Sequence, residues 1–144
     1  MRTSTMICAL GSVLATAALG GCSGDDAIEG KLPGVETGTL EQNWTIEGAK
    51  DVNQCQQHRA DRMRIVVLDA KGGVHATEFA PCNDFHKSLV LKTDVYSGNA
   101  SFVDGQGNPV SRTLPIPQFT VMEDRTVTMT VDFKAPDFQL PAPQ

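Results

Sequence analysis

Two pairs of cysteine and histidine are the residues of this 144-residue chain whose spacing could support chemistry. His58 lies three residues after Cys55, and His86 lies four residues after Cys82, so each pair could hold an ion from one turn. Two thiolates and two imidazoles suit tetrahedral Zn²⁺. The same cysteines could instead form a disulfide, which is the usual outcome in an oxidising compartment. The sequence lacks the Cys-x-x-Cys spacing that is typical of thiol-redox enzymes.

The beginning of the chain indicates which compartment applies. Arg2 provides a positive start, and residues 6–19 are uncharged and apolar but too short for a comfortable bilayer span. They lead into Leu-Gly-Gly directly before Cys22, which resembles the lipobox of bacterial lipoproteins. The resemblance implies that residues 1–21 are a removed signal peptide and that Cys22 carries a diacylglycerol and usually an N-acyl chain such as palmitate. An ordinary signal that is cut nearby, with Cys22 incidental, is the alternative.

A tether and a location follow from the next residues. Residues 22–37 are rich in glycine and acids and lack periodicity, so we expect a flexible tether that spans about 20 Å on average. Residue 23 is serine, whereas aspartate at this position retains lipoproteins of enteric bacteria in the inner membrane. We therefore expect a lipid-anchored protein of the cell envelope, in the outer membrane and facing the periplasm or the cell surface. The net charge of −5 argues against a nucleic-acid partner.

Export decides how the cysteines are used. Cys8 lies in the signal and Cys22 takes the lipid, so Cys55 and Cys82 remain as two thiols in an oxidising compartment. We predict that they form a disulfide. In the chain-entropy model, closing a loop of about 28 residues stabilises the fold by roughly 3.5 kcal/mol. The zinc site and a pair of free or redox-active thiols stay as alternatives, and the oxidation state of the thiols distinguishes them.

The elements that would position these residues read as short strands separated by turns. Apolar residues alternate most clearly over residues 126–133, where Val127, Met129, Val131 and Phe133 are expected to be buried. Strands are expected at residues 40–46, 63–68, 74–80, 88–91, 95–103, 110–114, 119–122 and 126–133. Residues 50–59 are polar and are expected to form one short helix or loop.

This spacing of strands predicts an all-β fold. Seven or eight short strands with turn signals every 8–12 residues are typical of an antiparallel β-sandwich. We assign the sandwich domain to residues 38–134 and a proline-rich tail to residues 135–144. Residues 104–108 fit a tight turn better than a Ca²⁺ loop.

A wider resemblance supports the sandwich. Asp94 lies two residues before Tyr96 at a strand start, which resembles the tyrosine corner of immunoglobulin-like domains. Residues across 38–134 resemble a family of small exported lipoproteins of myxobacteria and their relatives. These residues are Trp44, Ile46, Cys55, Arg64, Ile65, Cys82, Tyr96, Val103, Asp104 and Gly107. The resemblance implies an immunoglobulin-like or transthyretin-like sandwich. The chain departs from it at Asp94 and Val95, where such domains usually have glycine before the tyrosine.

No motif commits the chain to an enzymatic reaction or a cofactor. The Gly-x-Ser-x-Gly elbow, the phosphate-binding glycine loop and His-Glu-x-x-His are all missing from the sequence. We interpret the protein as a non-enzymatic binding or structural module, anchored in the membrane, whose loops and edge strands meet an envelope protein or polysaccharide. The alternative is a metal-binding or thiol-redox protein that uses Cys55, His58, Cys82 and His86.

Overall fold

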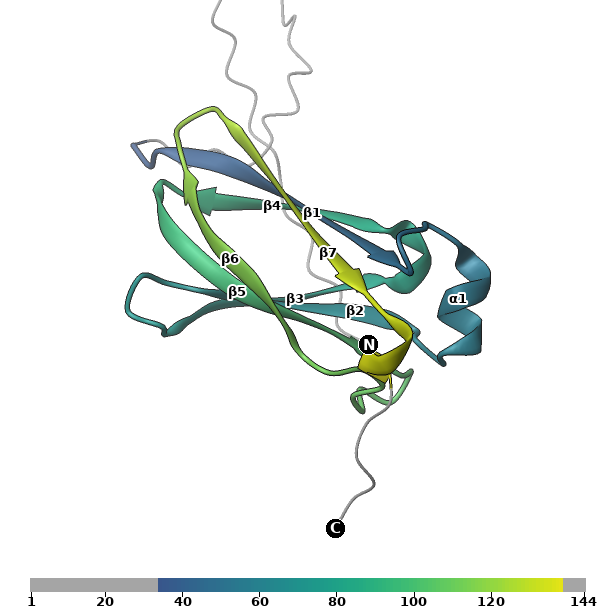
Figure 1. The fold of residues 1–144 in the computed structure, drawn as a ribbon. Coiled ribbons are helices and arrows are strands. Elements are labelled where there is room, and N and C mark those ends of the chain that lie inside the picture. The colour runs from purple at the N-terminus through teal and green to yellow at the C-terminus, as the bar shows by residue number, and fades with distance from the viewer. Residues whose placement is uncertain (1–33, 139–144) are drawn as a thin grey trace, which may run out of the picture. The chain divides into compact units, whose positions relative to one another are not determined.

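The computed structural model describes residues 34–138, which fold into two facing β-sheets (Figure 1). The strands are β1 (Thr37–Ile46), β2 (Arg62–Leu68), β3 (Val74–Pro81), β4 (His86–Lys92), β5 (Asp94–Val103), β6 (Leu114–Val121) and β7 (Thr126–Phe133). The helices are α1 (Val52–Gln57) and two 3-10 turns, η1 (Cys82–Asp84) and η2 (Ala135–Phe138). One sheet has the strand order β4-β1-β7 and the other has the order β3-β2-β5-β6. The all-β sandwich expected from the sequence is confirmed.

The core lies between the sheets and is built by alternation along the strands. Leu40, Trp44 and Ile46 of β1 are completely buried, as their period-two spacing predicts. Gln42 shares this face and is 1% exposed, which the pattern did not suggest. Its side-chain Nε2 donates a hydrogen bond to the carbonyl oxygen of Met129 at 3.4 Å, so part of its polarity is satisfied inside the sandwich.

The pairing of β1 with β7 is parallel, while the other strand pairs are antiparallel. The register runs from Thr39 opposite Thr126 to Ile46 opposite Phe133 without a break. The sequence interpretation foresaw only antiparallel pairs. The difference arises because β6 and β7 belong to different sheets. The short turn between them carries the chain from one sheet to the other and reverses its direction, so β7 runs beside β1 in the same direction as β1.

The separate strand expected at residues 110–114 is wrong, whereas the strand expected at 119–122 is the second half of one longer strand, β6. It begins at Leu114 and runs through both Pro115 and Pro117. Proline cannot donate to a strand ladder, so it is tolerated mainly in edge strands. β6 is such an edge strand and pairs only with β5, which explains why the two prolines do not end it.

The alternation predicted for β7 is present, but burial is uneven along the strand. Val131 and Phe133 are buried, whereas Val127 and Met129 are only half-buried. β7 is the edge strand of its sheet, so side chains near its start have fewer neighbours to cover them. The intervening residues Thr126, Thr128 and Thr130 are exposed, as expected.

The predicted tyrosine corner is present at the start of β5. The hydroxyl of Tyr96 donates a hydrogen bond to the carbonyl oxygen of Lys92 at 3.2 Å, which lies upstream in the chain. Tyr96 is 2% exposed, so the bond satisfies a hydroxyl at the edge of the core.

The two ends of the sandwich differ in what they carry. The chain enters β1 at Thr37, beside the turn between β6 and β7, where a Cβ atom at Gly38 would lie 2.2 Å from the carbonyl oxygen of Met122. β1 then leads to the opposite end, where α1 and η1 lie (Figure 1). The predicted signal peptide, Cys22 and most of the tether fall outside the described residues. Within residues 34–138, no helix is long and apolar enough to cross a bilayer.

Candidate functional site

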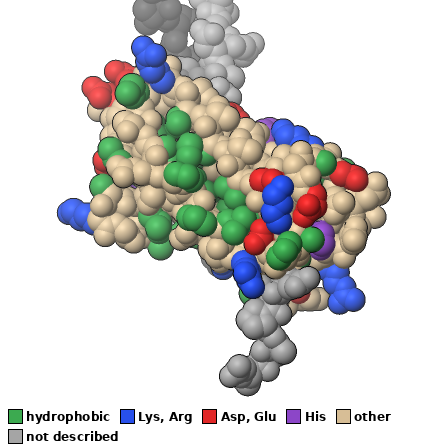
Figure 2. Space-filling view, viewed as in Figure 1, with side chains coloured by type: hydrophobic (Ala, Val, Ile, Leu, Met, Phe, Trp, Pro, Cys, Tyr) green, Lys and Arg blue, Asp and Glu red, His purple; other side chains and the backbone are tan. Residues whose placement is uncertain are grey.

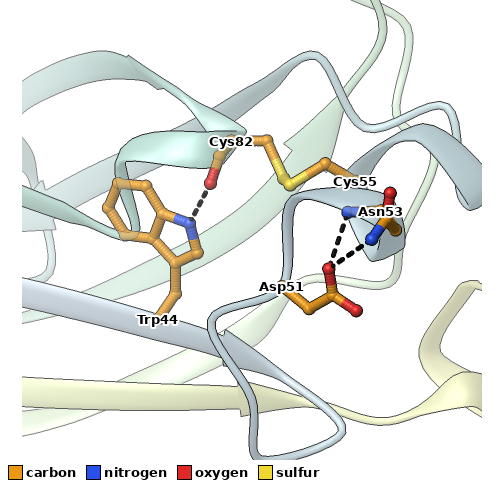
Figure 3. The surroundings of a disulfide bond; sticks show 5 residues. All are labelled: Trp44, Asp51, Asn53, Cys55 and Cys82. Atoms are coloured by element: carbon orange, nitrogen blue, oxygen red, sulfur yellow. Dashed lines mark hydrogen bonds between the residues drawn. A yellow bond between two sulfur atoms is a disulfide. The ribbon is translucent and has the colours of Figure 1, made fainter.

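A disulfide between Cys55 and Cys82 joins α1 to η1 at one end of the sandwich (Figure 3). The Cα atoms are 6.0 Å apart, and both residues are buried. This separation lies in the range that disulfides adopt. The pairing expected from the sequence is therefore confirmed.

Two hydrogen-bonding groups hold this corner in place. The side-chain Nε1 of Trp44 donates to the carbonyl oxygen of Cys82 at 2.9 Å, so β1 is bonded to the disulfide residue across the core (Figure 3). Asp51 caps α1, because its carboxylate accepts hydrogen bonds from the backbone N and the side-chain Nδ2 of Asn53, both at 2.9 Å. A six-residue helix is too short to be stable alone, so the cap and the disulfide keep it formed.

The two histidines near the cysteines do not extend the disulfide into a metal site. His58 stacks on Phe138, with ring centroids 3.9 Å apart. His86 is exposed, and its Nδ1 lies 3.1 Å from the carbonyl oxygen of Asp84. Both cysteine sulfurs are used in the disulfide, so neither is a thiolate that could bind zinc. Within residues 34–138, no three His, Cys, Asp or Glu side chains are grouped to hold a metal ion.

A cleft of about 590 Å³ opens beside the disulfide. Its walls come from α1, the segment between α1 and β2, η1 and the turn that follows β5. Five polar side chains that line it are exposed and have no hydrogen-bond or ion-pair partner among the described residues; they are Gln56, Arg59, Asp61, Asn83 and Gln106. Such side chains offer donors, acceptors and both signs of charge to a bound molecule, without first losing bonds inside the protein.

The turn on one side of the cleft is held by its own aspartate. The carboxylate of Asp104 accepts hydrogen bonds from the backbone N of Gln106 at 3.0 Å and from the backbone N of Asn108 at 2.8 Å. A further bond comes from the side-chain Nδ2 of Asn108, and these bonds lower the pKa of Asp104. The tight turn predicted for residues 104–108 is therefore confirmed, and this carboxylate serves the loop.

A second pocket, of about 380 Å³, lies at the opposite end between the turn after β2 and the start of β5. Tyr96 lines it, and its pKa is raised by burial and then by the nearby carboxylates of Asp94 and Asp69. His75 is exposed, with its ring centroid 5.1 Å from that of Tyr96. A tyrosine that keeps its proton and already donates to a backbone carbonyl is a structural residue. We therefore place the candidate site at the disulfide cleft.

Sequence reasoning found the disulfide of this site but not the side chains of the cleft. Gln56, Asn83 and Gln106 are amides in a short helix and in turns, where polar residues are ordinary. The only sequence feature that pointed to these side chains was the polar character of residues 50–59. No spacing rule links three segments that meet through the fold, so no motif could have identified them.

Comparisons with known proteins add little. No known family matches the chain, and no curated protein matches it. Among solved structures, the chain is similar to a leucine-rich repeat protein from Bacteroides thetaiotaomicron VPI-5482, with 13% sequence identity and a TM-score of 0.45. The match covers 69% of this chain and 12% of that chain, so this chain spans only a small part of that protein's length. We draw no functional conclusion from this likeness.

Proposed function

We propose that this protein is a lipid-anchored cell-envelope protein that binds a polar partner, without catalysis, in the cleft beside the Cys55–Cys82 disulfide. The observation that carries the proposal is the set of polar side chains in the cleft that have no partner inside the described domain. The lipobox-like sequence before Cys22 supports the anchor, and the resemblance to small exported lipoproteins belongs to the same proposal. The partner is an envelope protein or polysaccharide.

The position of the cleft suits an anchored binding module. The chain enters the sandwich at Thr37, and β1 is ten residues long. At about 3.3 Å per residue, β1 spans roughly 33 Å. The cleft lies beyond the far end of β1, so a protein tethered through its N-terminal residues would hold the cleft away from the membrane surface.

The frame around the cleft is rigid, which favours binding. The disulfide, the Trp44 bond to Cys82 and the Asp51 cap fix α1 on one side, and Asp104 fixes the turn on another. A pre-organised site loses less conformational entropy when a partner binds. The disulfide also supports an exported location, because such bonds persist in oxidising compartments.

Site-specific photo-cross-linking in cells tests the proposal. A photoreactive amino acid at Gln106 or Asn83 is expected to give one discrete cross-linked species. The matched control is Lys71, which is exposed and lines the pocket at the other end. A cross-link that also appears from Lys71, or no cross-link from either cleft position, would contradict the cleft as the binding site.

A further inference from the structure

The free edge of β7 lacks the protection that the other outer strands carry. The outer strands of the two sheets are β3, β4, β6 and β7. β6 contains Pro115 and Pro117, and β4 contains Lys87 and Lys92. β3 pairs with β2 through a register shift and ends at Pro81. Prolines, lysines and bulges are the features by which edge strands avoid pairing with other chains.

β7 has none of these features. Residues 126–133 contain no proline, lysine or arginine, and their pairing with β1 has no register shift. The only charge in the strand is Asp132, and its carboxylate is engaged by Thr45, Gly48 and Lys134. The edge is therefore regular and carries no unbalanced charge that would repel another strand.

The backbone groups that face this edge follow from the pairing with β1. At the start of β7, the N–H of Thr39 donates to the carbonyl oxygen of Arg125 at 2.9 Å. At its end, the N–H of Glu47 donates to the carbonyl oxygen of Phe133 at 2.8 Å. Successive residues of a strand direct their backbone groups to opposite sides, so the odd-numbered residues bond to β1. The residues whose N–H and C=O groups point to the free edge are Thr126, Thr128, Thr130 and Asp132.

The side chains along this edge also leave surface to be covered. Val127 and Met129 are half-buried at the margin of the core. β6 and β7 are edge strands of different sheets, and they contact each other along one side of the sandwich (Figure 1). Figure 2 shows a band of hydrophobic side chains across the face that carries these two strands. A strand added to β7 would cover part of this band.

We propose that β7 pairs with β7 of a second copy of this chain, antiparallel and around a two-fold axis that passes through Met129. In this register Met129 lies opposite its own copy, Val127 lies opposite Val131, and Thr128 lies opposite Thr130. The two small sheets then form one continuous sheet. This proposal goes beyond the binding function of the cleft and does not depend on it.

Self-pairing fits the edge for two reasons. The register brings apolar residues together on the inner face and places threonines opposite each other on the outer face, and cross-strand pairs of these kinds stabilise a sheet. It also places the outward N–H and C=O groups of the even-numbered residues of one copy opposite those of the other copy, so that they can hydrogen-bond.

The dimer is expected to be weak. One strand pair buries less surface than the roughly 1,600 Å² of a standard stable interface. Copies held on one membrane would be concentrated, whereas dilute protein would be monomeric. A covalent trap in cells is therefore the appropriate measurement.

Disulfide trapping at the proposed axis tests the register. In the full-length protein in cells, Met129→Cys is expected to form a covalent dimer on mild oxidation. Residue 129 and its copy would form a non-hydrogen-bonded antiparallel pair, in which the opposite Cα atoms are about 4.5 Å apart. Val127→Cys is the matched control, since it lies on the same face and is also half-buried. Two copies of residue 127 would be about 13 Å apart, so this variant should not cross-link. Val127→Cys combined with Val131→Cys should restore the dimer.

The wild-type protein shows how much covalent dimer the native cysteines form without an introduced cysteine. Failure of Met129→Cys to dimerise above that background, or equal dimer formation by Val127→Cys, would overturn the proposal. Both results can be obtained whether or not the cleft binds a partner.

Charged substitutions at Thr128 and Thr130 in the Met129→Cys protein provide an independent check of the register. Lysines at both Thr128 and Thr130 would place like charges opposite each other, and we expect the dimer yield to fall at least about fivefold. Thr128→Lys combined with Thr130→Glu would place opposite charges together, and we expect the yield to stay within about twofold of the parent. Both threonines are exposed, so a thermal melt should show that each variant is folded. Equal loss of dimer in both variants would overturn the register.

Discussion

The side-chain Nε1 of Trp44 lies 2.9 Å from the carbonyl oxygen of Cys82, so a tryptophan in the middle of the core is hydrogen-bonded to one half of the disulfide. Trp44 is completely buried, and Cys82 is 1% exposed. Water therefore does not reach the indole N–H or the carbonyl oxygen and cannot take the place of either partner. The bond connects β1 of one sheet to η1, the turn that directly follows β3 of the other sheet.

Trp44→Phe should destabilise the protein by about 1–3 kcal/mol, because the buried carbonyl oxygen of Cys82 would lose its 2.9 Å bond and keep only the longer bond from the backbone N of Phe85, at 3.4 Å. The measurement is urea unfolding of the oxidised protein. Thr128→Ala is the control, since Thr128 is exposed and should change the free energy of unfolding by less than about 0.5 kcal/mol. Equal, small effects of both substitutions would show that the bond contributes nothing.

Removing the disulfide with Cys55→Ala and Cys82→Ala should lower the free energy of unfolding by about 2–4 kcal/mol, because the unfolded chain gains entropy. The cysteines are separated by 27 positions in the sequence. Alkylation of the native protein before and after reduction measures the oxidation state. Two alkylatable thiols in the untreated protein, together with one bound zinc per chain by elemental analysis, would support the metal-binding alternative.

Val131→Ala should cost on the order of 1–3 kcal/mol, because a buried side chain is lost and a cavity remains. Val127→Ala should cost less, since Val127 is only half-buried on the same face of β7. Urea unfolding of the two variants measures the difference. A larger cost at Val127 would mean that the edge of β7 is covered in solution, as it would be in a stable dimer.

Asp132→Asn should destabilise the protein near neutral pH by about 1 kcal/mol, because hydrogen bonds to a charged acceptor are lost at a side chain that water partly screens. Burial opposes ionisation of Asp132, but hydrogen bonds from Lys134, Gly48 and Thr45 outweigh it and lower its pKa. A lowered pKa means that the folded state binds fewer protons, so this stabilisation is present above the unfolded pKa and is lost as the pH falls through the folded pKa.

Unfolding of the wild-type and Asp132→Asn proteins at pH 7 and at pH values below about 4 checks this sign, since unperturbed aspartate titrates near there. The difference between the two proteins should shrink in acid. Asp84→Asn is the control, because Asp84 is exposed and its carboxylate has no partner among the described residues. A difference that grows in acid would contradict the assigned role of Asp132.

Cys22→Ala should abolish lipid attachment and normal processing, because the cysteine sulfur is the proposed acylation site. Metabolic labelling with a fatty-acid probe measures attachment in cells. The disulfide variant with Cys55→Ala and Cys82→Ala serves as the control and should keep its label. Unchanged labelling of the Cys22→Ala protein would exclude the proposed anchor.

Much of the fold could be predicted from short stretches of sequence. Alternation of apolar residues located β1 and β7, and a run of β-branched residues located β2. The turns at residues 69–73 and 104–108 were evident from their glycines and aspartates. Asp69 and Asp104 each accept hydrogen bonds from backbone N–H groups within the next four residues. These features depend on residues that are neighbours along the chain, so a reader of the sequence can recognise them.

Strand order, the run of β6 through two prolines and the cleft could not be predicted in this way. β1 and β7 pair in parallel although Trp44 and its partner Val131 are far apart in the chain. Pro115 and Pro117 read as strand breakers until β6 is known to be an edge strand. The cleft side chains Gln56 and Gln106 meet only because the sheets bring α1 beside the turn after β5. Local sequence sets which face of a strand is apolar, whereas burial of those faces against one another sets which strands become neighbours and which edge stays open.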